Sequence, residues 1–191
     1  MLNQGLFFIL NTVFGLFIIA LLLRFYLQLF RAPYRNPLSH FLISLTDFLV
    51  RPARKIIPGL WGLDLATLLL AWIIEFLVLA AILWINGIAP HPYTPISLLV
   101  ILLLSLMGLL KHSIHIFMLV LIVQAVLSWV NPYSPISGVL DSLSRPFLIF
   151  FRRRIPLIGN VDISPLIVLI LLQFILAVPV AWIDSLLYGM F

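Results

Sequence analysis

Apolar residues gather into long runs along this chain, and the segments between the runs carry most of the charge. Four runs are long enough to cross a hydrocarbon core, which needs roughly 20 apolar residues in helical form. These runs cover residues 6–29, 65–86, 114–131 and 163–184. A fifth, shorter run covers 96–110 and ends at the polar triplet Lys111-His112-Ser113. The pattern predicts an all-α membrane protein with about four transmembrane helices.

Two connecting segments have apolar residues every three or four positions instead. In the first, Asn36 suits a helix N-cap and Pro37 the first helical position, and in the second Ser134 and Pro135 take these roles. The stripes consist of Leu38, Phe41, Leu42, Leu45, Phe48 and Leu49, and of Ile136, Val139, Leu140, Leu143 and Phe147. Each predicts an amphipathic helix that lies in the headgroup layer or packs on the protein's own spans, and both can hold at once.

The chain contains an internal duplication. The matched positions, 98 residues apart, are Arg54 and Arg152, Pro58 and Pro156, Asp64 and Asp162, and Glu75 and Gln173. Upstream, one inserted residue brings Pro132 onto Pro33. The sequence therefore predicts two tandem span-loop-span repeats, residues 1–94 and 95–191. Both loops leave from the same side, so the repeats are parallel, an arrangement that some transporters also use.

Charged residues make up only 9% of the chain, against 64% hydrophobic residues, and the net charge is +5. Of the eleven Lys and Arg residues, five lie between residues 31 and 55 and four between 145 and 154. The positive-inside rule therefore places loops 30–63 and 132–161 in the cytoplasm and both termini outside. Arg24, near the end of the first span, is expected to snorkel to the cytoplasmic interface.

The same rule bears on the short run 96–110. If 96–110 and 114–131 both crossed, the second basic loop would lie outside, so together they should make one crossing. We predict a short re-entrant or interfacial helix for 96–110, with the outer end of one long tilted helix as a further option. The alternative topology has five crossings, with Lys111 inside.

Each basic cluster stands between an amphipathic segment and the next span. The candidate lipid- or partner-binding residues are Arg51, Arg54, Lys55, Arg145, Arg152, Arg153 and Arg154. A cation beside an anionic leaflet contributes about 1 kcal/mol, so the clusters either anchor the protein on headgroups or form a defined anion or partner site. Pro58 and Pro156 predict a turn, after which Asp64 and Asp162 cap the next helix or pair with the arginines.

Glu75 lies near the midplane of the second predicted span, where an ionisable side chain is costly and suggests function. It is either protonated and hydrogen-bonded or part of an ion or proton path, and its repeat mate Gln173 is neutral. His112 and His115 share a helical face but lack a nearby acidic or Cys residue in the sequence, so we predict no metal or cofactor. Phosphate-loop, dinucleotide and hydrolase motifs are absent, which argues against an enzyme. The membrane-proximal basic residues lack interleaved aromatics, which argues against nucleic-acid binding.

Pro33-Tyr34 and Pro132-Tyr133, with basic-Ile-Pro runs before Asp64 and before Asp162-Ile163-Ser164-Pro165, resemble the YggT family in its two-cassette bacterial form. The resemblance covers about residues 5–185, although Ala66-Thr67 replaces the Ser-Pro pair in the first cassette. It implies an integral protein of the bacterial inner (plasma) membrane, linked to protection against osmotic stress. Gram-positive relatives are associated with cell-division genes, and plastid relatives with nucleoid distribution and haem attachment. No catalytic residues are implied.

These observations favour a non-enzymatic scaffold or assembly factor whose basic loops bind anionic membrane lipids and a membrane protein complex. The alternative is a small transport or channel component for ion or osmotic balance. Four spans make a thin pathway, so this alternative would need a homo-oligomer. Chemistry on lipid headgroups by Asp64 and Asp162 has the least support, because these residues follow no recognised catalytic spacing.

Overall fold

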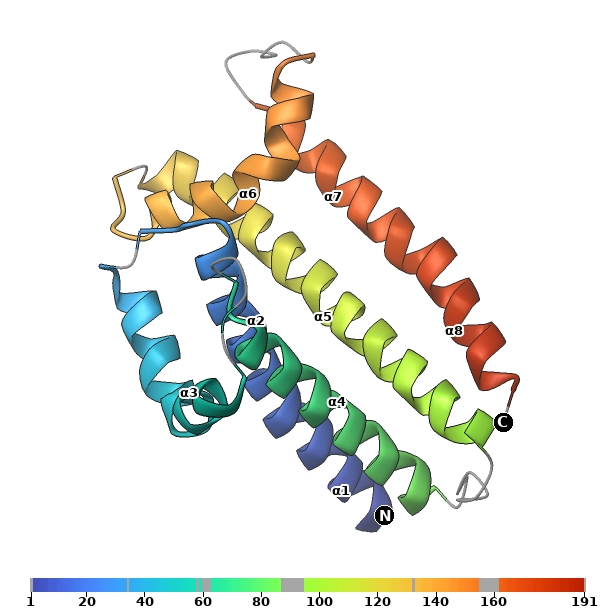
Figure 1. The fold of residues 1–191 in the computed structure, drawn as a ribbon. Helices are drawn as coiled ribbons and strands as arrows, with labels where there is room; N and C mark the ends of the chain where they lie inside the picture. Colours follow the sequence, from blue (N-terminus) through green and yellow to red (C-terminus); the bar gives the residue numbers. More distant parts are fainter. Residues whose placement is uncertain are drawn as a thin grey trace.

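The computed structural model describes residues 2–33, 35–57, 59, 63–86, 95–131, 133–154 and 162–190, which are largely helical (Figure 1). The helices are α1 (Leu2–Ile9), α2 (Gly15–Leu29), α3 (Pro37–Ile56), α4 (Leu65–Ile85), α5 (Pro95–Val130), α6 (Ser137–Arg152), α7 (Ser164–Ile175) and α8 (Ala181–Tyr188). A π-helical turn, Leu10–Phe14, joins α1 to α2, and another, Leu176–Val180, joins α7 to α8. Pro179 lies in the second turn, and because proline lacks a backbone N–H it does not fit a regular α-helical interior.

Four helical stretches are long and apolar enough to span a membrane. They are Gln4–Leu29, Leu65–Ile85, Ser97–Ser128 and Ser164–Tyr188. A helix satisfies its own backbone hydrogen bonds, which hydrocarbon cannot do for it. Large apolar side chains such as Leu77 and Leu119 stay on the outer surface, as lipid contact requires. The predicted all-α membrane fold with four spans is confirmed.

The prediction of a separate short helix at 96–110 is wrong. Residues 95–130 form one continuous helix, so the short run is the outer part of α5. At 1.5 Å per residue these 36 residues extend about 54 Å, well beyond a hydrocarbon core of about 30 Å. Polar residues at 111–113 lower the hydropathy of this stretch, but they leave the helical backbone hydrogen bonds intact.

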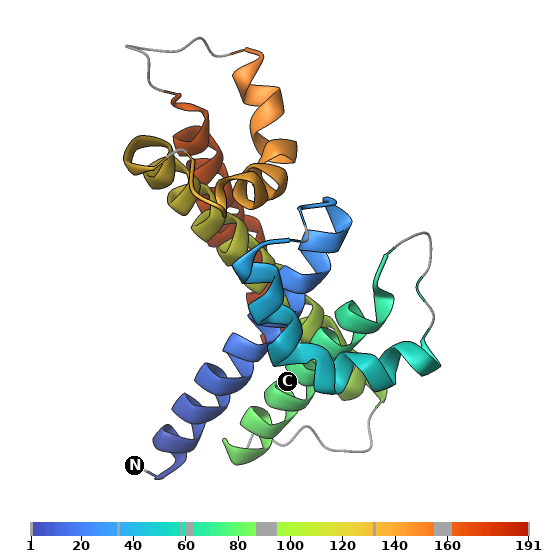
Figure 2. The ribbon, with the colours of Figure 1, turned by 90° about the vertical axis from the view of Figure 1, so that its left-hand side faces the viewer.

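Both loops contain the predicted amphipathic helices, which differ in how they use their apolar stripes. In α3, Leu42 is buried against the spans, whereas Phe41 and Phe48 are exposed. In α6, Val139 and Leu143 are both buried. The first stripe is therefore divided between the protein and its surroundings, and much of the second packs on the protein itself. α3 also bends along its length (Figure 2), and Pro52 within it accounts for the bend.

The helix starts differ between the loops. Asn36 caps α3 as predicted, its side-chain oxygen accepting a hydrogen bond of 2.8 Å from the backbone N–H of Ser39. The prediction that Ser134 caps the second helix is wrong, because α6 begins at Ser137. The backbone C=O of Ser134 accepts from the N–H of Ser137 in a turn, so the chain reverses before the helix starts. Pro58 and Pro156 lie outside the described residues.

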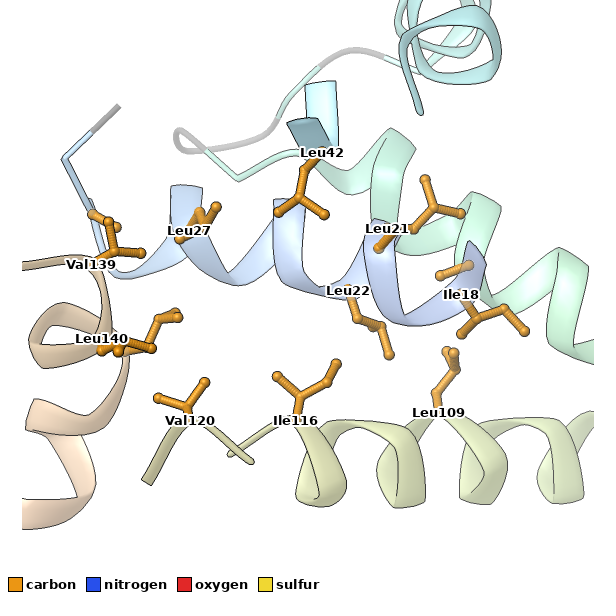
Figure 3. Packing of buried hydrophobic residues seen from close by; sticks show 14 of the residues in the cluster. Ile18, Leu21, Leu22, Leu27, Leu42, Leu109, Ile116, Val120, Val139 and Leu140 are labelled. Atoms are coloured by element: carbon orange, nitrogen blue, oxygen red, sulfur yellow. The ribbon is translucent and has the colours of Figure 1, made fainter. Parts of the chain in front are cut away.

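The core is built where α2 packs between α4 and α5. Figure 3 shows Leu22 of α2 facing Ile116 of α5, with Leu21 on the side of α4. α5 also contacts α6, α7 and α8, so it is the helix around which both repeats are assembled. In Figure 1 the two termini lie toward the lower right, whereas α3 and α6 lie toward the left and top. The amphipathic helices thus share one end of the bundle and the termini the other.

Candidate functional site

An arginine-aspartate pair recurs at matched positions of the two repeats. Arg54 Nη2 lies 2.5 Å from Asp64 Oδ2, and Arg152 Nε lies 2.8 Å from Asp162 Oδ2. Asp64 also accepts hydrogen bonds from the hydroxyl and backbone N–H of Thr67, and so caps α4. Asp162 accepts a hydrogen bond of 2.9 Å from the backbone N–H of Ser164 at the start of α7. In each repeat the pair ties the end of an amphipathic helix to the start of the next span.

Both aspartates stay ionised well into acid solution. Burial by itself would raise the pKa of the Asp64 carboxyl, but hydrogen bonds from Arg54 and Thr67 and the Arg54 charge outweigh burial and lower the pKa. At Asp162, burial by itself would also raise the pKa. Hydrogen bonding from Ser164, together with the hydrogen bond and charge of Arg152, outweighs burial and lowers the pKa overall. A helix cap or an ion pair was expected for these residues. Asp64 makes both, whereas Asp162 makes the ion pair but stands one residue before Ile163, the N-cap of α7.

The other five candidate basic residues remain on the surface. Arg51 pairs with Asp47 at 3.1 Å and still exposes most of its side chain, and the Arg154 guanidinium lies 4.1 Å from the ring centre of Phe150. Lys55, Arg145 and Arg153 are exposed. Within the described part of the chain, no carboxylate forms an ion pair with these three.

Arg24 does not snorkel as the sequence analysis expected. Its side chain is buried, and its guanidinium donates to Thr46 Oγ1 at 2.7 Å and to Asp47 Oδ1 at 2.9 Å. It therefore holds α3 against α2. Thr46 and Asp47 are adjacent polar residues in a largely apolar part of α3. This was the available sign in the sequence that α3 could bind a cation from another helix. In the second repeat, a polar contact also joins the first span to the amphipathic helix: the Gln124 amide nitrogen of α5 lies 3.4 Å from Asp141 Oδ1 of α6.

The interior contains a second set of polar contacts, all made by the middle of α5. His112 Nε2 lies 3.4 Å from Glu75 Oε2 on α4, and Lys111 Nζ lies 2.7 Å from Asp184 Oδ2 on α8. Two hydroxyl contacts flank them: Tyr26 donates to Ser113 at 2.8 Å and Trp72 donates to Ser105 at 2.8 Å. Sequence reasoning found Glu75 and His112 separately but not as a pair. Their separation in the sequence hides the contact until α4 and α5 are packed together.

A close approach of α4 and α5 makes the Glu75-His112 contact feasible. A Cβ placed on Gly108 would lie 1.9 Å from Glu75 Oε1, so a side chain there would displace the carboxylate. Gly108 precedes His112 by one helical turn, a spacing that could have signalled the site. The contact brings a carboxyl group and an imidazole together between α4 and α5. The described residues contain no cluster of three or more His, Cys, Asp or Glu side chains suited to a metal ion.

Gln173 is not placed like Glu75. Its side chain is exposed on α7, on the outer surface of the bundle. The two repeats, which match at this position in sequence, therefore use it in different surroundings.

The fold and these sites define a class: a four-span helical membrane protein built from two tandem span-loop-span repeats, each with an arginine-aspartate pair at its second span. The family described as CCB3/YggT matches the chain twice, at residues 3–85 and 97–183. The chain belongs to this family.

Bacterial relatives match nearly the whole chain. Escherichia coli K12 YggT is 39% identical over 169 residues, covering 88% of this chain and 85% of its own. A protein of Pseudomonas aeruginosa is 35% identical over 176 residues, covering 91% and 87%. A protein of Haemophilus influenzae is 36% identical over 175 residues, covering 91% and 90%. All three are named as uncharacterised proteins. No solved structure matches the chain.

Proposed function

We propose that this protein is a non-enzymatic scaffold or assembly factor of the bacterial inner membrane. Its two amphipathic helices, α3 and α6, bind anionic lipid headgroups and dock a membrane protein complex. The proposal places both loops in the cytoplasm and both termini outside, in accordance with the positive-inside rule. The cellular role it assigns is protection against osmotic stress, which the family resemblance implies.

The observation that carries this proposal is the composition of the outer surface of α3 and α6. Phe41 and Phe48 of α3 are exposed near one end of the bundle, and Lys55 is exposed farther along the same helix. Arg145 and Arg153 extend the exposed positive charge to α6 and its end. Exposed aromatic rings and exposed cations on the same pair of helices suit the boundary between acyl chains and anionic headgroups.

The lipid-binding part can be tested without disturbing the arginine-aspartate pairs. We would replace Lys55, Arg145 and Arg153 together with Gln and reconstitute the protein in nanodiscs with and without phosphatidylglycerol. We expect the native protein to be more stable in the anionic discs, and the variant to lose that difference, because each cation contributes about 1 kcal/mol near an anionic surface. The matched control, Lys55→Arg with Arg145→Lys and Arg153→Lys, keeps every charge. Equal stability of the native protein in both kinds of disc would count against lipid binding.

A small transport component is the second candidate, and the Glu75-His112 pair favours it. A carboxyl-imidazole pair between two membrane spans is the kind of group that ion and proton paths use. Glu75→Gln keeps the side-chain size and replaces the carboxyl group with an amide. Proteoliposomes of the native protein should then show an ion or proton flux that this variant abolishes, whereas a flux indifferent to the change would remove the transport reading.

A cell assay separates the two candidates. A bacterial strain that lacks its own relative would carry either the Gln variant of the three cations or Glu75→Gln under hyperosmotic stress, after membrane insertion and topology have been checked. The scaffold proposal expects only the cation variant to fail. Failure of Glu75→Gln alone would instead favour transport.

A further inference from the structure

We propose that copies of this chain associate head to tail, with α7 and α8 of one copy packing on the first span of the next. The contact would repeat, between chains, the interface that α4 and α5 make inside one chain. This inference rests on the internal repeat and does not depend on the proposed function.

The internal interface is defined by one face of α4. Trp72 donates to Ser105 of α5, Glu75 contacts His112, and Leu79 packs with apolar residues at the outer end of α5. Farther along the same face, Leu83 is only 3% exposed. The first repeat thus presents α4 to the first span of the second repeat.

The matching face of α7 and α8 is exposed on the outer surface of the protein. Adding 98 to the four α4 positions gives Ile170, Gln173, Ala177 and Ala181, and all four are exposed. Ile170 is 61% exposed, whereas its counterpart Trp72 is largely covered. α7 contacts α5 and α6, and the described residues show no extended contact between α7 and the first span. The positions that α4 uses for this interface therefore recur on α7 and α8, where they are exposed and, in the described part of the chain, have no extended contact with the first span.

The receiving surface is also bare. The offset of 99 that relates Pro132 to Pro33 places Ser105, Gly108 and His112 on Leu6, Ile9 and Val13 of the first span. Leu6, Ile9 and Val13 are 42%, 56% and 58% exposed. Val13 also lines an apolar groove of about 800 Å³ between the first span and α3, so the free surface continues into a recess.

Exposed apolar residues alone would be ordinary lipid contacts, but Gln173 is not apolar. An amide in the hydrocarbon layer needs a hydrogen-bond partner, and Gln side chains commonly bond across helix interfaces there. Thr12, one turn from Ile9 on the receiving face, is exposed and supplies a hydroxyl. Ala177 and Ala181 are small enough to let two helices approach closely. The polar group and the small residues thus fall on the face that the repeat assigns to a neighbour.

The two surfaces differ, so the contact is heterologous. Such a contact joins each copy to two others and closes into a ring or continues as a row, unlike a two-fold dimer in which one surface meets itself. A ring would also enlarge any pathway beyond what four spans can enclose.

The chain has no cysteine, which permits a direct test. The Trp72-Ser105 contact corresponds to Ile170 of one copy and Leu6 of the next. We would co-express Leu6→Cys and Ile170→Cys chains with different tags and oxidise them in membranes. We expect disulfide-linked dimers from the mixture, none from either chain alone, and a ladder of larger species from a chain with both changes. Leu171→Cys, one residue along α7 and about a quarter turn around it, replaces Ile170→Cys as the matched control and should not cross-link.

Cross-linking of a single variant with itself would indicate a two-fold dimer and overturn the proposal, as would a mixture that links no better than the control. A second variant, Gln173→Leu, keeps the side chain exposed and should not disturb folding. It should weaken self-association in bilayers by about 3- to 10-fold, the effect of one interhelical polar contact. Unchanged association would exclude Gln173 from the contact and contradict the proposed interface.

Discussion

Arg54 and Arg152 form the same kind of ion pair with an aspartate in the two repeats. Each arginine stands ten residues before its aspartate and joins an amphipathic helix to a span. Asp64 is nearly fully buried and has an additional hydroxyl donor, whereas Asp162 is partly exposed. The two repeats therefore provide the same interaction at two degrees of burial.

We predict that Asp64→Asn destabilises the protein more than Asp162→Asn does. The first change should cost about 2 kcal/mol and the second about 1 kcal/mol, because a charged hydrogen bond is worth more when it is buried. Denaturant unfolding of the purified protein in mixed micelles measures both. Equal losses would mean that the difference in burial has no energetic consequence.

The same aspartates predict an acid limit to stability. Their folded-state pKa values lie below the usual 3.8, so their contribution is fully present above the unfolded pKa and is lost as pH falls through the folded pKa. Stability attributable to the pairs should be constant from pH 7 to about pH 5 and should fall progressively as the pH drops below 3.8, the usual value for an aspartate. Unfolding curves of the native protein and of the Asp64→Asn, Asp162→Asn double variant should therefore converge in acid. A constant difference between the curves at all pH values would contradict this.

Sequence reasoning predicted these pairs and missed others for a physical reason. Arg54 and Asp64 are close in the chain, so a turn between two helices brings them together with little freedom. Arg24 and Asp47, or Glu75 and His112, meet only after helices choose which faces to pack. A hydropathy pattern that is apolar all around, as in α4, does not specify that rotation.

Whole helices show a similar division between what is local and what is not. The N-cap and stripe of α3 follow from nearby residues and were predicted, whereas the partners of Lys111 and His112 on α8 and α4 depend on how the helices pack. Sequence hydropathy treats these residues as an interruption. In the structure they form contacts with α8 and α4, and the helix continues through them.

Packing of α3 predicts unequal effects along one stripe. Leu42→Ala should cost about 3 kcal/mol of unfolding free energy, because it leaves a cavity between α3 and α2. Phe41→Ala, one position away and exposed, should cost less than about 1 kcal/mol. Unfolding measurements in the same micelle compare the two directly. A large loss for Phe41→Ala would show that this ring packs on the protein after all.

The close contact of α4 with α5 predicts that the effect of Gly108→Ala on stability changes sign when Glu75 is removed. In the native background, Gly108→Ala should destabilise by about 1 kcal/mol, because its Cβ displaces Glu75 and the loss exceeds the gain in helix propensity. In a Glu75→Ala background the obstacle is gone, and the same change should stabilise by up to about 1 kcal/mol. A double-mutant cycle from unfolding curves tests this. Additive effects would show that the two side chains do not touch.

Across the molecule, the duplication and the number of spans were readable from sequence, but the relation between the repeats was not. The offset of 98 equates Glu75 with Gln173, yet α4 packs on both α2 and α5, whereas α7 packs on α5 and α6. The equivalent positions have unequal surroundings because the first repeat is followed by a second one, on which α4 packs, whereas the second repeat is followed by none. For this reason Gln173 is exposed, whereas Glu75 reaches His112 of α5.

The Lys111-Asp184 pair lets stability and function be separated for the molecule as a whole. Lys111→Met or Asp184→Asn alone leaves one charge without its partner inside the bundle and should cost about 2 kcal/mol. Replacing both, with Met and Leu, removes the charges together and should restore most of that stability, because an apolar pair needs no desolvation. Unfolding in micelles gives the energies, and growth under hyperosmotic stress gives the function. If the charges serve only to join α5 to α8, the double variant will protect cells as the native protein does. If it is stable but fails to protect, the charges are needed for more than folding, and the interior of the bundle becomes the place to look for transport.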